Sequence, residues 1–131
     1  MFSKTITIFN KKFNKETRTD VYKRTILNGV HTEKVNAGSM DDKRMKVNDS
    51  LFVIIPFSID GYVKPKEYQS LEDVDNKWTL NNGDIIVISE IDNDIESTKE
   101  LSDLEHYTIT SAETIDYSVT CLNHYEVYAS W

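Results

Sequence analysis

The sequence predicts an all-β protein, mainly antiparallel, that folds as a small barrel or sandwich of about seven or eight strands with two short helices and one long loop. Several stretches alternate apolar and polar residues, which is typical of strands that bury one face. Two continuous apolar runs, at 51–57 and 85–88, are typical of strands that are covered on both faces. No strand–helix–strand rhythm appears, so a parallel sheet is disfavoured.

The first 20 residues predict one strand and one loop. Ile6 and Ile8 alternate with threonines over residues 4–9, so we expect one face of this strand in the core and the other in solvent. Residues 10–20 interrupt the alternation with basic side chains and asparagines. We therefore expect a polar hairpin loop there.

The dipeptide Asn28-Gly29 predicts the next hairpin. Both central positions of a type I′ turn need a positive φ, which favours Asn-Gly. Residues 21–27 predict the strand before the turn, and residues 30–35 predict the strand that returns from it.

Residues 36–50 predict a long flexible loop. About 15 residues without periodicity are unusual inside a compact domain, and such a segment is either functional or disordered. The alternative to a functional loop is an insertion between two strands that has no role of its own. The residues that we single out as a candidate interface or channel loop are Lys34, Ser39, Met40, Asp41, Asp42, Lys43, Arg44 and Met45.

The two apolar runs are expected to pair with each other. Pro56 lacks a backbone donor, so the end of the first run is expected at an edge or a bulge. Pro65 suits the first position of a short helix, because its fixed φ is helical. Asn82-Gly83 predicts a turn directly before the second run.

The carboxyl-terminal third predicts a capped helix and further strands. Ser97 and Glu100 fit a capping box, in which each side chain satisfies a free amide of the other, and predict a helix to about Glu105. Strands are expected at residues 107–115, 117–122 and 123–130. In the last strand, Tyr125, Val127 and Ala129 share one face, and His124, Glu126 and Tyr128 share the other.

Composition predicts one domain, residues 1–131, because 131 residues with 39% hydrophobic content suffice for one modest core. The formal charge of −7 argues against nucleic-acid binding through a basic surface. We expect no membrane span, since no apolar run is long enough, and no signal peptide at the amino terminus. Cys121 is the only cysteine and forms no internal disulfide, which agrees with a reducing compartment.

No pattern predicts catalysis, a cofactor or a metal. Asp92, Asp94 and Glu96 alternate like the start of a calcium loop, but the glycine and the closing glutamate of such a loop are missing, so a solvated turn is expected. The three histidines do not have the spacing of metal ligands. We found no phosphate loop, nucleophile elbow or pair of catalytic carboxylates, and we predict that the protein is not an enzyme.

Several stretches, taken in chain order, are similar to motifs of one known family. T-I-T-I-F-N-K at 5–11 and the segment 16–31, which contains Y-K-R-T-I-L-N-G-V-H, resemble "I-T-L-Y-N-K" followed by "Y-x-R-T-V-I-x-G-V-x-W". Y-V-K-P-K-E-Y at 62–68, W-T-L-N-N-G-D-I-I-V at 78–87 and Y-T-I-T-S at 107–111 resemble "Y-V-x-P-K-E-(W/Y)", "W-T-L-x-x-G-D-I-I-V" and "f-T-I-T-S-V". These motifs are typical of small neck proteins of tailed bacteriophages and prophages of Gram-positive bacteria.

The resemblance implies a β-barrel head-completion, or stopper, protein without catalytic activity. Such a protein is made in the host bacterial cytoplasm and forms a homo-oligomeric ring in the virion neck, where it joins head to tail. Its partners would be the portal or adaptor and the tail proteins, with DNA only as passing cargo and no membrane. The loop at 36–50 would then reach toward the channel axis or a neighbouring ring, and an acidic excess suits a channel that DNA must leave quickly.

The chain departs from that family at His31-Thr32, where an aromatic residue usually follows Gly-Val, and at residues 123–131, which lack a Trp-Lys-Val strand. The contacts of a carboxyl-terminal edge strand are therefore the part for which the resemblance implies least. Within the same class, the alternative is a tail-terminator or another neck ring. From a different class, the alternative is a monomeric β-barrel module that binds a small ligand or a peptide, and a hydrolase ranks below both.

Overall fold

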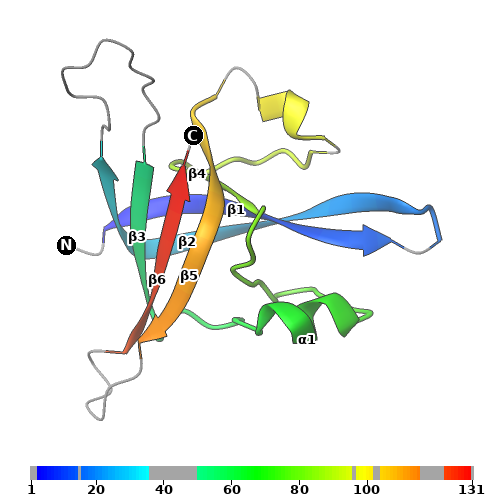
Figure 1. The fold of residues 1–131 in the computed structure, drawn as a ribbon, viewed down its shortest axis with the longest axis horizontal. Helices are drawn as coiled ribbons and strands as arrows, with labels where there is room; N and C mark the ends of the chain where they lie inside the picture. Colours follow the sequence, from blue (N-terminus) through cyan, green and yellow to red (C-terminus); the bar gives the residue numbers. More distant parts are fainter. Residues whose placement is uncertain are drawn as a thin grey trace.

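Six antiparallel strands close into a barrel in the computed structural model, which describes residues 3–14, 16–35, 50–95, 97–101, 104–115 and 123–130 (Figure 1). The strands pair in the order β1-β2-β3-β6-β5-β4, and β4 pairs with β1 to complete the ring. The mainly antiparallel prediction is confirmed. Six strands are described where seven or eight were expected, and the strand predicted at 117–122 lies outside the described residues. The strands are β1 (Lys4–Asn14), β2 (Thr19–Val35), β3 (Ser50–Pro56), β4 (Ile85–Val87), β5 (His106–Ile115) and β6 (His124–Ser130).

Within the described residues, one α-helix and one 3-10 helix accompany the barrel. α1 (Pro65–Ser70) begins at the predicted proline. The predicted capping box is also present, because the Ser97 amide donates to Glu100 Oε2 at 3.0 Å, but it caps only the 3-10 helix η1 (Thr98–Leu101). None of the described helices is long and apolar enough to span a membrane.

Asn28-Gly29 forms a bulge within β2, so the predicted hairpin turn is wrong. Thr5 pairs with Asn28 and Lys4 with Val30, which leaves Gly29, at φ +87°, as the extra residue. A bulge that begins with a left-handed glycine needs the same positive φ as a type I′ turn, so this dipeptide fits both. The bulge lies where β2 passes from pairing with β1 to pairing with β3, and one strand thus serves two neighbours.

The predicted polar loop at 10–20 is largely strand. β1 continues to Asn14 and β2 already begins at Thr19, so only a short turn separates them, with Arg18 at φ +57°. Side chains of the polar stretch continue to point alternately to the two faces of the ribbon, as in any strand. A high content of polar residues was therefore not a sign of a loop here. The resulting hairpin projects far from the barrel (Figure 1). We call residues 11–23 the arm; the structure describes all of them except residue 15.

The two apolar runs do not pair, contrary to the prediction. β3 pairs with β2 and β6, whereas β4 pairs with β1 and β5, which places the runs on opposite sides of the ring. β4 is buried on both faces, as predicted, but β3 alternates between buried and partly exposed residues. The carboxyl-terminal strand β6 lies between β3 and β5 and is therefore not an edge.

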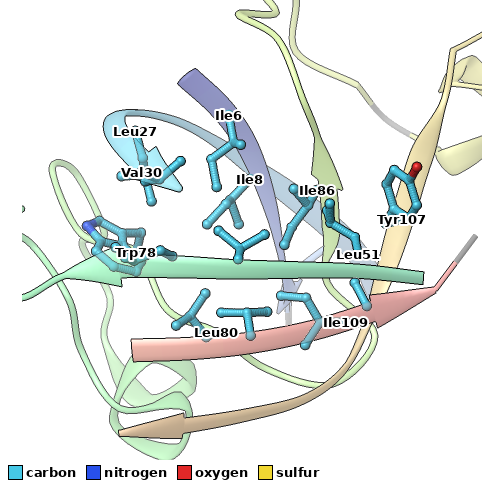
Figure 2. Packing of buried hydrophobic residues seen from close by; sticks show 14 residues of the cluster. Ile6, Ile8, Leu27, Val30, Leu51, Trp78, Leu80, Ile86, Tyr107 and Ile109 are labelled. Atoms are coloured by element: carbon cyan, nitrogen blue, oxygen red, sulfur yellow. The ribbon is translucent and has the colours of Figure 1, made fainter. Parts of the chain in front are cut away.

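The main core fills the barrel interior (Figure 2). Trp78 lies at one end, where its indole Nε1 donates to the Asp60 carbonyl at 2.8 Å and its ring packs edge-on against Tyr62. Tyr107 is completely buried at the opposite end. The predicted inner face of the first strand is confirmed, and in the last strand Val127 and Ala129, predicted to share a face, both point into the core. Buried core residues include Ile6, Ile8, Leu27, Val30, Leu51, Val53, Ile55, Leu80, Ile86, Ile109, Val127 and Ala129.

A second apolar cluster covers the outer face of β1 and β4, which we call the covered face. It consists of Phe9, Ile85, Val87, Ile95 and Leu101. The polypeptide after β4 folds back over these strands, so Thr7, expected in solvent, is fully buried. Its hydroxyl donates to the Ser89 carbonyl at 2.7 Å and accepts from the Ile91 amide at 2.9 Å.

Candidate interaction surface

The outer face of β3 and β6 has no comparable cover among the described residues. Phe52 pairs with Tyr128 across the two strands, with ring centroids 5.0 Å apart, and the Tyr128 side chain is 41% exposed. The neighbouring strands β2 and β5 add acidic side chains in the same register. We call this surface the open face, and it consists of Glu33, Phe52, Ile54, Glu113, Glu126 and Tyr128.

A pocket of about 420 Å³ lies at the end of the open face that is nearer to the carboxyl terminus. Phe52 and Tyr128 supply its aromatic lining, and Thr110 and Ser130 supply hydroxyl groups. Glu33 also lines the pocket. This combination of apolar walls with a few polar groups is typical of a surface that receives a side chain or a small ligand.

The open face is acidic. Glu113 and Glu126 lie directly opposite each other on β5 and β6, an arrangement that is unfavourable for like charges. His124 Nε2 lies 2.9 Å from Glu126 Oε2, within hydrogen-bonding distance. Partial burial raises the pKa of Tyr128, and the charges of Glu126 and Glu113 raise it further. The negative potential therefore extends to the exposed ring.

The arm has the opposite charge. Residues 11–23 contain five basic and two acidic residues, whereas the whole chain carries −7. The arm also exposes two apolar side chains, Phe13 at 51% and Val21 at 42%. Lys12 lies opposite Val21 on one face of the ribbon, and Lys23 follows two residues later on the same face. Neither lysine forms an ion pair with any other described residue.

A buried polar network holds the base of the arm. The Asp84 carboxylate is almost fully buried and accepts hydrogen bonds from the Lys11 amide at 3.0 Å, from Asn10 Nδ2 at 2.8 Å and from the Asn81 amide at 3.2 Å. Asn10 also exchanges two hydrogen bonds with the backbone of Thr79. Burial raises the pKa of Asp84, while these hydrogen bonds lower it. The network thus joins β1 to the turn before β4.

Tyr68 on α1 is fully buried near this network. Burial, together with the charge of Asp84, raises the pKa of the Tyr68 phenol to about 12. The phenol is therefore neutral at physiological pH. The Tyr68 hydroxyl has no hydrogen-bond partner among the described residues, so the base of the arm is held by the hydrogen bonds of Asp84 and Asn10.

The sequence-predicted interface residues are only partly described. Lys34 lies at the end of β2, and its Nζ is 2.9 Å from Glu105 Oε2. The Tyr107 hydroxyl donates to Glu105, and this hydrogen bond, followed by Lys34, lowers the pKa of that carboxyl. Lys34 is therefore part of a structural bridge near one end of the barrel. The other candidates, Ser39, Met40, Asp41, Asp42, Lys43, Arg44 and Met45, lie outside the described residues.

The acidic turn predicted at 92–96 is solvated on its described part. Asp94 accepts a hydrogen bond from Arg24 Nε at 2.9 Å, and Asp92 is exposed; Glu96 is outside the described residues. Within the described part of the chain, no three His, Cys, Asp or Glu side chains are grouped so that they could hold a metal ion. Cys121 also lies outside that part.

Neither the open face nor the arm was predicted from the sequence as an exposed surface. The sequence placed Glu126 and Tyr128 on one face of the last strand without marking that face as exposed. The run that forms β3 was expected to be covered on both sides, so Phe52 was not recognised as exposed. For the arm, the signal was the apolar residues Phe13 and Val21 within a polar stretch. Such residues are typical of strands that alternate, and they argued against a loop.

A family model matches residues 1–130, almost the entire chain. The chain belongs to DUF6751, a family of unknown function. No curated protein and no solved structure matches this DUF6751 chain significantly.

Proposed function

We propose that this protein is a structural subunit of a phage neck that assembles as a homo-oligomeric ring and joins head to tail around the DNA channel. One observation carries the structural part of this proposal: a closed barrel presents a basic projecting arm and, separately, an uncovered acidic and aromatic face. The resemblance of its sequence motifs to head-completion proteins supports the place in the virion.

A closed barrel limits how such a subunit associates. Each of the six described strands has a neighbour on both sides in the ring, but β4 pairs only with residues 7–9 of β1 and β3 only with residues 31–35 of β2. The two strands of the arm therefore pair only with each other, and their outer edges are free. Association can therefore use the free edges of the arm, side chains on the outer faces, or the loops. An exposed aromatic residue such as Tyr128 is typical of interfaces, because it buries a large area for a small loss of conformational freedom.

The net charge agrees with a wall beside passing DNA. A chain of −7 repels the phosphate backbone, which keeps the polymer from adhering during transit. In this proposal the loop at 36–50 extends toward the channel axis or toward a neighbouring ring. The protein contributes mechanical complementarity, and no bond is made or broken.

Light scattering coupled to size exclusion tests the neck assignment. The purified chain should form rings, alone or on its partner, and should co-elute with the portal or adaptor protein that its own gene cluster encodes. A control protein from an unrelated phage should not co-elute. A chain that stays monomeric and binds neither partner contradicts the proposal.

Deleting residues 40–45 tests the role of the loop. The deletion should leave the circular-dichroism spectrum and the melting temperature close to those of the wild type, while complementation of a phage that lacks the gene should yield fewer joined particles. Electron microscopy of lysates would then show more separate heads and tails. An unchanged titre would remove the loop from the proposed mechanism.

The pocket on the open face favours one second candidate, a monomeric module that binds a small apolar ligand or a peptide. A volume of about 420 Å³ lined by Phe52 and Tyr128 accommodates a modest side chain or ligand. A fragment screen followed by NMR shift mapping would separate this candidate from the neck subunit. Saturable shifts confined to the pocket of a strictly monomeric protein would favour it.

A further inference from the structure

We propose that the arm of one subunit docks on the open face of a second copy, with the surface formed by Lys12, Val21 and Lys23 against Phe52, Tyr128 and the surrounding glutamates. This inference deepens the proposed function, on which it rests, by assigning the contact between ring neighbours. The arm and the open face are different patches of one chain, so the contact is heterologous and repeats from copy to copy.

Charge complementarity identifies the occupant. The arm is a basic segment in an acidic chain, and Lys12 and Lys23 form no ion pair with any described residue. The open face places Glu33, Glu113 and Glu126 around its aromatic pair. A basic segment of the same chain is therefore the most direct source of cations for this acidic surface.

The opposed carboxylates of Glu113 and Glu126 also favour a cationic occupant on the open face. Two like charges directly across a strand pair are unfavourable in the isolated chain. Among the described residues, Glu113 has no cationic partner. A lysine ammonium placed between the two carboxylates would convert this repulsion into attraction.

The spacing of the two surfaces also matches. On the arm, Lys23 follows Val21 by two residues, which is one same-face step of about 7 Å along a strand. On the open face, Glu126 precedes Tyr128 by the same step. When Val21 packs on the Phe52–Tyr128 pair, Lys23 reaches the Glu113–Glu126 pair. Lys12 is directly beside Val21 and then lies above the row of paired residues that contains Glu33.

A charge-swap experiment tests the docking. The arm-reversed variant is K12E/K23E and the face-reversed variant is E33K/E113K, all four at positions that are partly or fully exposed. Sedimentation equilibrium of the full chain, at concentrations up to about 1 mM, measures self-association, and that limit covers weak specific binding. Each variant alone should associate about 100-fold or more weakly than the wild type, because like charges would meet across the contact.

Mixing the two variants provides the decisive measurement. The acidic arm of K12E/K23E is complementary to the basic face of E33K/E113K. The wild-type basic arm of E33K/E113K is likewise complementary to the wild-type acidic face of K12E/K23E. Equimolar mixing should therefore restore association. The matched control is K66E/K77E, which reverses two lysines at exposed positions outside both surfaces and should associate like the wild type. Unchanged melting temperatures show that every variant is folded.

The outcomes separate the docking from the neck assignment. Three results would each overturn the docking. The variants could self-associate like the wild type, the mixture could fail to associate, or the wild-type chain could stay monomeric up to about 1 mM. Substituting Phe13, which lies on the other face of the arm, by serine should leave association within about twofold of the wild type. Chains that form rings through the swapped charges but bind neither portal nor adaptor would contradict only the neck assignment.

Discussion

The covered face and the open face are built from similar strands but differ in what lies over them. On β1 and β4 the outward residues Phe9, Ile85 and Val87 are buried, because the polypeptide after β4 packs over them. On β3 and β6 the outward residues Phe52 and Tyr128 stack on each other and remain partly exposed. The first face is completed within the chain, whereas the second has the composition of a surface that another molecule completes.

The largest expected difference between the two faces is in stability. Phe9→Ala should lower the free energy of unfolding by about 3–5 kcal/mol, because it leaves a cavity under a fully buried ring. Phe52→Ala should cost only about 1 kcal/mol, since the lost contact is mainly the pairing with Tyr128. Urea denaturation measures both. Equal losses would mean that the open face is as integral to the fold as the covered face.

The polar network beside the covered face predicts the next effect. Asp84→Asn should lower the free energy of unfolding by about 1–3 kcal/mol, because the amide nitrogen that replaces one carboxylate oxygen is a donor and cannot accept the hydrogen bonds that this oxygen receives. The matched control is Asp75→Asn at an exposed position, which should change stability by about 0.5 kcal/mol or less. Similar values for the two variants would show that the network does not stabilise the base of the arm.

Arg24 holds the covering segment in place and predicts a smaller, local effect. Its guanidinium donates to the Ile91 carbonyl and to Asp94, both at 2.9 Å. Arg24→Gln should cost about 1 kcal/mol, because the interaction with the exposed Asp94 is weakened by solvent. Hydrogen exchange should accelerate at the Ile91 amide and remain unchanged in β3. Uniform acceleration throughout the chain would instead indicate global destabilisation.

The bridge between Lys34 and Glu105 predicts the smallest effect, and it depends on pH. The pKa of Glu105 is lowered from the ordinary value of 4.5 by the hydrogen bond from Tyr107 and then by Lys34. The carboxylate therefore contributes stability that is fully present above 4.5 and is lost as pH falls through its folded pKa. Glu105→Gln should be slightly less stable than the wild type at neutral pH, and urea midpoints should converge in acid. A difference that persists in acid would exclude the carboxylate charge as the cause.

Local patterns in the sequence predicted most strands and their faces. Ile6, Ile8, Val127 and Ala129 point into the core as their alternation indicated, Pro65 begins α1, and Ser97 and Glu100 cap η1. These features depend on residues within a few positions of each other, so they can be recognised without knowledge of the neighbours. The motifs that resemble neck proteins likewise come from the sequence, and the function that they imply stays a proposal.

The tertiary structure decided which strands pair and which faces are covered. Asn28-Gly29 suits a turn or a bulge equally, and only the availability of β1 on one side and β3 on the other makes it a bulge. The two apolar runs resemble each other in sequence, yet one is buried on both faces by the returning polypeptide, and the other leaves Phe52 partly exposed. Burial of an outward face depends on contacts between residues distant in the chain, which periodicity does not encode.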